Sequence, residues 1–331
     1  MRTLVYAAGS GPGPLATFCA AKLQAGGVDV TLVAGGEHGR RLGEHGIRIR
    51  LPGGREELHR VRLTEGISPD DRYDLVLIFT PRPDVSRLLP TLAANPHVGT
   101  FLFLHNNSAG FREYSEALGA HRVMAGYMVV TAVDDGVEDG APTIWISRNR
   151  AFASPIGELE GVTSGQIRAV AALLRRIDGL KIEVRGDMDA WLTSHNLSTL
   201  TYLGLYAADL DPDRYARTGG ALRMGIRARA EAIRAQRAAG IPLSPPIFSI
   251  LPLFPEAVAV WILRRVVATD FFRKGVVGIS RDRREELTYA IEEYRDRIAP
   301  GGAPTPTVDR LIEHMRGERP PLPDGSDGWD L

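Results

Sequence analysis

The feature of this sequence that most constrains its fold is a strand, a turn rich in glycine, a helix and a second strand within residues 3–36. Apolar residues 4–8 predict a short buried strand, residues 15–23 suit a helix, and residues 30–33 predict the second strand. A unit of this kind opens the doubly wound α/β folds that bind dinucleotides. The sequence therefore predicts an α/β protein that begins with a Rossmann-type domain.

The glycines of the turn fit a dinucleotide-binding pattern in two registers. One runs from Gly9 through Gly11 to Pro14, and the other runs from Gly11 through Gly13 to Ala16. We prefer the second, because Ala16 is the small residue that close packing of helix and strand requires, and Gly13 lets the backbone approach a pyrophosphate. The prolines on either side of Gly13 lack an N–H, so two phosphate donors are lost. The alternative is a tight turn that binds nothing.

The residues that follow the second strand bear on which dinucleotide is held. Dinucleotide-binding folds place an acid here for a ribose hydroxyl, or an arginine for a 2′-phosphate. This chain has Gly35 at that point, and Arg40 and Arg41 are close enough to substitute for the arginine. The alternative for both arginines is solvated charge on an exposed helix.

Composition bears on the classes of partner and site. The 40 basic and 40 acidic residues give no electrostatic case for nucleic acid or an anionic membrane. The single cysteine, Cys19, excludes an intramolecular disulfide and a cysteine-based metal cluster, and we expect it in the core. Two prolines and three charges interrupt the apolar run 247–268, which is then unsuited to span a bilayer. We expect no metal site. We also expect a cytoplasmic protein, since a strand at residue 3 leaves no room for a secretory signal.

Polar residues follow a predicted central strand. Residues 74–80 form the continuous apolar run that is typical of a parallel strand buried on both faces, and residues 100–104 predict the next strand. Asn106 comes just after the carboxyl end of that strand, where doubly wound sheets bind ligands. We therefore predict that Asn106 is a site residue. The alternative is that it caps the helix that starts near Phe111.

The second half of the chain is predicted to be helical. Strand signals nearly vanish after residue 187, and helical patterns dominate between prolines and glycines. We expect a Rossmann-type domain over 1–185, an all-helical domain over 186–316, and a disordered tail over 317–331, where proline, glycine and aspartate are frequent.

The sequence resembles the ketopantoate reductases and their relatives over most of its length. The resemblance is carried by the glycine turn and by the segments VTLVAGGEHGRRLGEHGIRI, DLVLIFT, LFLHNNSAG, DMDAWLTSHN and REELTYAIEEYRDRIAPGGAPTPTVDRLIEHM. It implies an N-terminal Rossmann domain, an all-helical C-terminal domain and an active site in the cleft between them. It also implies NADPH-dependent reduction of a 2-keto acid or a similar carbonyl.

The chain departs from the family at functional positions. Family members usually carry a lysine, the general acid, two residues after a tryptophan, and this chain has Thr193 there. A second family lysine corresponds to Pro81, with Arg82 beside it, and the arginine expected to hold the 2′-phosphate corresponds to Gly35. A positioned general acid typically contributes about 10²–10⁴ in rate, so these losses predict a poor reductase.

Asn106 matches a family site residue, and Glu286 in the REEL segment matches less closely. His195 is a candidate replacement acid because histidine titrates near neutrality; the alternative is a histidine bonded within the packing of the two domains. The leading hypothesis is an NADP(H)-dependent oxidoreductase with Asn106, Thr193, His195 and Glu286 at the catalytic site. The alternative is a reductase-like fold that has lost hydride transfer and serves a different reaction or binds a ligand. We expect a small-molecule substrate, with a homodimer left open.

Overall fold

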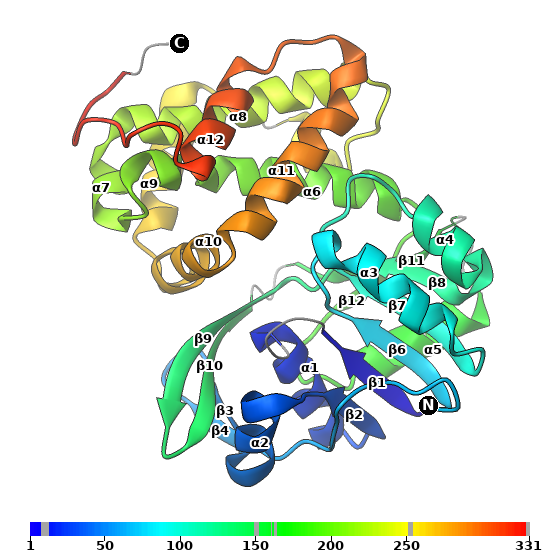
Figure 1. The fold of residues 1–331 in the computed structure, drawn as a ribbon. Coiled ribbons are helices and arrows are strands. Elements are labelled where there is room, and N and C mark those ends of the chain that lie inside the picture. The colour runs from blue at the N-terminus through cyan, green and yellow to red at the C-terminus, as the bar shows by residue number, and fades with distance from the viewer. Residues whose placement is uncertain (8–12, 149–151, 160, 162–163, 251–253, 329–331) are drawn as a thin grey trace. The chain divides into compact units, whose positions relative to one another are not determined.

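Figure 1 shows the fold of the chain. The structure is a computed structural model that describes residues 1–7, 13–148, 152–159, 161, 164–250 and 254–328, apart from the side chain of residue 148. Gly9 and Gly11, which the sequence predicts in the dinucleotide turn, lie outside the described residues.

The main sheet has eight strands, and all its neighbouring pairs are parallel except one (Figure 1). In spatial order they are β12 (Ile182–Val184), β11 (Ser154–Glu158), β8 (Val123–Gly126), β7 (Val98–Leu104), β6 (Tyr73–Ile78), β1 (Thr3–Tyr6), β2 (Val30–Val33) and β5 (Leu63–Thr64). The exception is the antiparallel pair of β8 and β11. In the centre, Val5 pairs with Leu32 on one side and Leu77 on the other. The strand order therefore runs from β1 to β2 on one side of the sheet and continues from β6 to β7 on the other side. The boundary between β1 and β6 is the switch point where doubly wound folds bind ligands.

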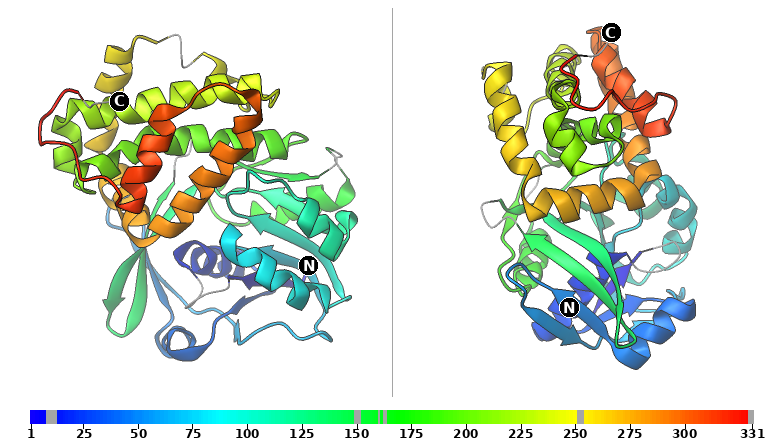
Figure 2. Two further views of the ribbon diagram at one scale, coloured as in Figure 1. Left: turned by 45° about the horizontal axis from the view of Figure 1, so that its top comes forward. Right: turned by 90° about the vertical axis from the view of Figure 1, so that its left-hand side faces the viewer.

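A second, four-stranded sheet follows the order β4 (Glu56–His59), β3 (Ile47–Arg50), β10 (Ala141–Arg148) and β9 (Val130–Glu138). β9 and β10 form an antiparallel hairpin, drawn in green from two further sides in Figure 2. β10 pairs with β3, so the hairpin belongs to this second sheet and not to the main sheet. The last strands added to the main sheet are β11 and β12.

Helix α1 (Pro14–Ala25) packs against β1 and β2 of the main sheet and against β3 and β9 of the second sheet. Its residues 16–23 are all buried, including Cys19, as expected. A helix that is apolar all round belongs in an interior, and Lys22 is the exception. Its ammonium lies 2.8 Å from a carboxylate oxygen of Glu57 on β4, and both side chains are largely buried. This ion pair ties α1 to the second sheet.

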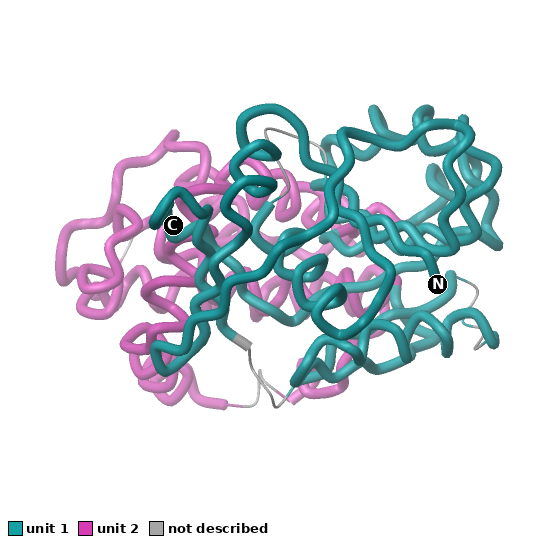
Figure 3. The backbone as a smooth tube through the Cα atoms, turned by 90° about the horizontal axis from the view of Figure 1, so that it is seen from below, with its two compact units in different colours: residues 1–106, 111–188 teal, residues 107–110, 189–331 magenta. Residues whose placement is uncertain are grey.

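The chain divides into two units, coloured separately in Figure 3. Unit 1 comprises residues 1–106 and 111–188, and unit 2 comprises residues 107–110 and 189–331. Each unit has its own hydrophobic core. Unit 1 also holds α2 (Gly36–His45), α3 (Arg82–Ala93), α4 (Arg112–Leu118) and α5 (Gly165–Leu174).

Unit 2 is helical, and no strand occurs after Val184 in the described part of the chain. Its α-helices are α6 (Met188–Tyr202, whose first residue is counted with unit 1), α7 (Pro212–Arg217), α8 (Gly219–Ala238), α9 (Glu256–Val267), α10 (Val277–Asp282), α11 (Arg284–Ile298) and α12 (Pro306–Arg316). Close approaches need glycine. A Cβ at Gly225 of α8 would lie 2.4 Å from the carbonyl oxygen of Thr201. The expected α/β architecture followed by a helical region is confirmed.

The segment after α12 differs from the expected disordered tail. Over residues 317–328 the structure holds it against unit 2: Leu322 donates its N–H to Ala207, and Arg217 pairs with Asp324 through two 2.6 Å hydrogen bonds. The composition of this segment favours disorder only while its charges lack partners. Here arginines of α7 and α8 supply them, and the prolines reduce the entropy lost on ordering.

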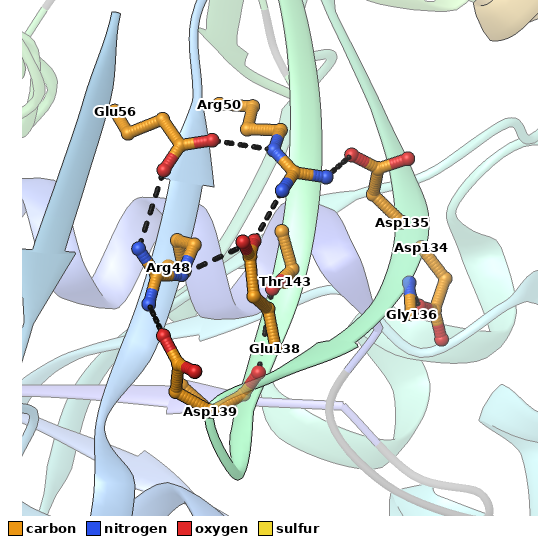
Figure 4. A network of polar contacts seen from close by, with 10 residues as sticks. Arg48, Arg50, Glu56, Asp134, Asp135, Gly136, Glu138, Asp139 and Thr143 are labelled. Carbon is orange, nitrogen blue, oxygen red and sulfur yellow. Dashed lines mark hydrogen bonds and ion pairs between the residues drawn. The ribbon is translucent and has the colours of Figure 1, made fainter.

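One face of the second sheet carries a network of exposed charges (Figure 4). Arg48 pairs with Glu56, Glu138 and Asp139, and Arg50 pairs with Glu56, Asp135 and Glu138. Each arginine of β3 links Glu56 on the neighbouring β4 to carboxylates at the far side of β10, on β9 or in the turn that follows it. The network therefore stabilises the position of the hairpin through ion pairs that link it to β3 and β4.

Candidate functional site

The turn after β1 leads into α1 through Gly13. Gly13 is extended (φ −60°, ψ 163°) and begins the helix without a side-chain cap, and a Cβ at this position would meet no atom within 4 Å. Ala16, one turn later, is fully buried. The backbone at Gly13 thus faces open space at the carboxyl end of β1, where the preferred glycine register places a pyrophosphate.

A cavity of about 280 Å³ opens where β2 and β5 end. It is lined by Ala34, Gly35, Gly36, Gly39, Arg40, Leu63, Thr64 and Glu65. Glycine is required at Gly39, because a Cβ there would lie 2.5 Å from the carbonyl oxygen of Ala34, so α2 can approach the end of β2. Neither Gly35 nor Gly36 would place a Cβ within 4 Å of another atom. Pockets for drug-sized ligands span roughly 300–1,000 Å³, so this cavity suits one part of a larger ligand.

Two arginines of α2 lie at and beside the cavity, and both are paired. Arg40 donates to Glu37 and to Glu44, and Arg41 donates to Glu37 at 2.8 Å. These hydrogen bonds lower the pKa of Glu37 to about 2 and raise that of Arg40. The four charges sum to zero, and all four side chains are well exposed.

A second set of polar side chains in unit 1 lies at the ends of β6 and β7. Asn106 follows β7, and its side-chain oxygen is buried and has no hydrogen-bond partner among the described residues. Its neighbour His105 lies 3.1 Å from the Tyr114 hydroxyl through Nε2, and burial, together with Arg82, lowers the pKa of His105 to about 3. Arg82, just past β6, pairs with Glu113 at 3.2 Å and lies over the Tyr114 ring. His105 is therefore neutral, and Arg82 is the neighbouring cation that disfavours its protonation.

The alternative role of Asn106 as a helix cap is wrong. Phe111 occupies the cap position of α4, and no side chain caps that helix. Between them, residues 107–110 belong to unit 2: Ser108 donates its N–H to Glu293 at 2.7 Å and accepts a 2.9 Å bond from Asn196. Asn106 is thus the last residue of unit 1 before this segment.

Thr193 and His195 lie on α6 in unit 2. Thr193 is fully buried, and its hydroxyl donates to the carbonyl oxygen of Asp189 at 2.8 Å. The imidazole of His195 stacks on Trp191, with ring centroids 5.2 Å apart and planes 8° apart. Burial lowers the pKa of His195 to about 4, so its titration is displaced from the neutral range that the sequence suggests.

Glu286 lies in the first turn of α11 and is half-buried, with Arg283 2.6 Å from its carboxylate. Three predicted catalytic residues, Thr193, His195 and Glu286, therefore belong to unit 2, whereas Asn106 belongs to unit 1. Sequence reasoning missed Glu65 and His105. His105 carries the same signal as Asn106, a polar residue after a buried strand, but β5 spans only two residues and gives Glu65 no such signal.

Two further kinds of feature are absent from the described ranges. No group of three or more histidine, cysteine, aspartate or glutamate side chains is arranged to hold a metal ion. None of the described helices combines the length and the apolar character needed to cross a membrane.

These observations define a class of protein. The chain combines an N-terminal Rossmann-type domain, which has a parallel-strand sheet, with an all-helical C-terminal domain. Within this class, residues 10–147 match the family model described as ketopantoate reductase PanE/ApbA. The chain resembles the ketopantoate reductase family, as a divergent member.

Solved structures show the same fold over 96% of this chain. D-mandelate dehydrogenase with NADH and anilino(oxo)acetate has a TM-score of 0.72 and 16% identity, with 98% of its chain covered. The 2-dehydropantoate 2-reductase from Geobacter metallireducens GS-15 has a TM-score of 0.70 and 17% identity over its whole chain (100%). The PanE/ApbA family ketopantoate reductase from Ralstonia eutropha JMP134 has a TM-score of 0.67 and 17% identity, with 97% covered. A comparison with curated protein sequences gave no match.

Proposed function

We propose that this protein is an oxidoreductase of the ketopantoate reductase type that uses a nicotinamide dinucleotide to reduce a 2-keto acid or a related carbonyl. The observation that carries the proposal is the open, glycine-lined cavity at the end of β2, within residues 10–147, which match the family model. The residues present fit the cofactor: Gly13 leaves room for a pyrophosphate, and Gly35 and Gly36 leave room for a ribose. When bound, the nicotinamide supplies the hydride.

The resemblance implies NADP(H) as the cofactor. Arg40 lines the cavity and Arg41 follows it on α2, so these are the cations that we propose for its 2′-phosphate, and both already bind Glu37. Each would have to exchange a glutamate for the phosphate. We therefore expect weak binding of NADP(H), held by these two arginines.

The candidate catalytic residues include no side chain that is well suited to deliver a proton at pH 7. We propose that Asn106 contacts the bound ligand, because its buried side-chain oxygen, a hydrogen-bond acceptor, has no described partner and its position follows a central strand. We propose Thr193, His195 and Glu286 as candidate catalytic residues of unit 2. Thr193 cannot deliver a proton, since its hydroxyl is bonded to Asp189 and a hydroxyl titrates far above any working pH. With a pKa of about 4, only about one His195 in a thousand is protonated at pH 7.

A second candidate is favoured by these same observations. A reductase-like fold that has lost hydride transfer would retain the ribose cavity while its former acid position, Thr193, serves only the helix. Such a protein would bind a dinucleotide and leave ketopantoate unreduced.

Turnover of ketopantoate with NADH and NADPH separates the two candidates. A slow wild-type rate that Thr193→Lys raises, while Thr193→Met does not, supports the reductase, because methionine matches much of the length of lysine without its charge. Nucleotide binding without turnover in any of the three proteins supports the second candidate. Failure to bind either nucleotide contradicts both.

We also propose a cytoplasmic protein whose partners are a small-molecule substrate and a second copy of the chain. Helix α9 and the segment before it expose six large apolar side chains, each between 41% and 58% accessible. They are Ile247, Ile250, Phe254, Val258, Trp261 and Ile262. Helix α9 is apolar on both its inner and outer faces, so we expect another protein surface to cover the outer face.

A second copy suits this surface as its cover. A two-fold axis at α9 would bring the same exposed apolar side chains of both copies together. A two-fold interface repeats every contact, so each copy would cover the apolar surface of the other.

A further inference from the structure

We infer that the cavity beyond β2 selects a ribose with free 2′- and 3′-hydroxyls, so that this protein prefers NAD(H) to NADP(H). This inference rests on the proposed function and reverses the cofactor that the family resemblance implies. It follows from the charges that line the cavity and from the partners that those charges already have.

The position directly after β2 offers no cation. Gly35 is extended (φ −117°, ψ −178°), a conformation open to any residue, and no atom lies within 4 Å of where its Cβ would be. The backbone therefore does not demand glycine here. The space that a phosphate-binding arginine would fill is open, and a ribose can enter it.

Arg40, which lines the cavity, already donates its hydrogen bonds to carboxylates. Arg40 uses all three of its nitrogens: Nε and one terminal nitrogen donate to Glu37, and the other donates to both oxygens of Glu44 at 2.7 and 2.8 Å. A 2′-phosphate would have to take Arg40 from these partners. It would then lie beside two released carboxylates, and like charges at such distances repel.

Glu65 lines the cavity from the side of β5 and further favours NAD(H) over NADP(H). Its carboxylate accepts hydrogen bonds only, so it suits the hydroxyls of a ribose and opposes a phosphate. Arg40 lines the cavity and forms a neutral group with Glu37, Arg41 and Glu44, so together with Glu65 these five side chains carry one net negative charge. A hydrogen bond to a charged group, such as one from a ribose hydroxyl to the Glu65 carboxylate, contributes about 1.5–3 kcal/mol. A 2′-phosphate would lose this bond, which corresponds to a preference for NAD(H) of about ten- to a hundredfold.

The inference is tested by titrating the protein with NADH and NADPH and following nicotinamide fluorescence at fixed ionic strength. We expect the wild type to bind NADH at least about tenfold more tightly. Glu65→Gln should lower this ratio, and Gly35→Arg should reverse it by supplying the cation. Asp84→Asn, which neutralises an exposed acid on α3 outside the cavity, is the control and should leave the ratio unchanged.

Each outcome has a distinct meaning. NADPH binding that equals or exceeds NADH binding in the wild type overturns the inference but leaves the proposed function in place. A preference for NADH that neither Glu65→Gln nor Gly35→Arg alters also overturns it, because the discrimination then arises elsewhere. Binding of neither nucleotide, in protein that remains folded by circular dichroism, overturns the proposed function together with this inference.

Discussion

The ion pair between α1 and β4 predicts how strongly the helix of the dinucleotide turn is held. Lys22 and Glu57 lie 2.8 Å apart with 10% and 13% of their side chains exposed, and His59 lies 2.9 Å from the same Glu57 oxygen. The hydrogen bond from Lys22 is the largest cause that lowers the pKa of Glu57 from its ordinary 4.5 to about 2. One pKa unit corresponds to 1.36 kcal/mol, so the ionised carboxylate stabilises the fold by at most about 3 kcal/mol.

We expect Glu57→Gln to lower the free energy of unfolding by about 2–3 kcal/mol at pH 7, because the variant leaves Lys22 largely buried without its counter-charge. The pKa of Glu57 is depressed in the folded state, so its stabilisation is complete above about pH 4.5 and is lost as the pH falls toward 2. The difference between wild type and variant should therefore shrink between pH 5 and about pH 3, as measured by urea unfolding.

Glu37→Gln is the matched control. The pKa of Glu37 is also lowered to about 2, but its pairs with Arg40 and Arg41 are well exposed. Solvent screening makes such pairs weak, so this variant should change stability much less and its effect should fall with added salt. Equal losses in both variants, or a Glu57→Gln effect that is independent of pH, would refute the reasoning from burial.

Three further predictions concern the site and the assembly. Trp261→Glu should shift the protein from dimer to monomer in light scattering, whereas Phe152→Glu, at another exposed aromatic residue, should not; a monomeric wild type contradicts this. His195→Ala should leave the pH profile of turnover unchanged between about pH 6 and 8, since the pKa of His195 is lowered to about 4; loss of a step near pH 6.5 would show that His195 is the acid. Asn106→Ala should lower kcat/KM by about tenfold or more through the lost hydrogen bond, and unchanged turnover would remove Asn106 from the site.

The strands and helices that carry strong local patterns could be predicted from the sequence. β6 (Tyr73–Ile78) overlaps the continuous apolar run at 74–80, and the helices of unit 2 lie between prolines and glycines as expected. β5 spans only two residues, so it has no periodicity to detect. Glu65 follows it and was missed for that reason.

The tail shows the limit of composition as a guide. Proline, glycine and aspartate favour disorder over residues 317–328, yet Asp324 meets Arg217, which is 107 residues away in the chain. The partner of a charge is set by the fold. No local pattern in the tail could predict this contact.

The sequence by itself determined the order of the elements, the glycine turn and the helical second half, because burial and backbone preference act over a few neighbouring residues. Only the tertiary structure decided the chemistry. It paired Arg40 with Glu37 and Glu44, brought Glu65 to the same cavity, and lowered the pKa of His195 through burial. Charge and desolvation depend on which groups meet across distant segments, and packing of the whole unit sets those distances.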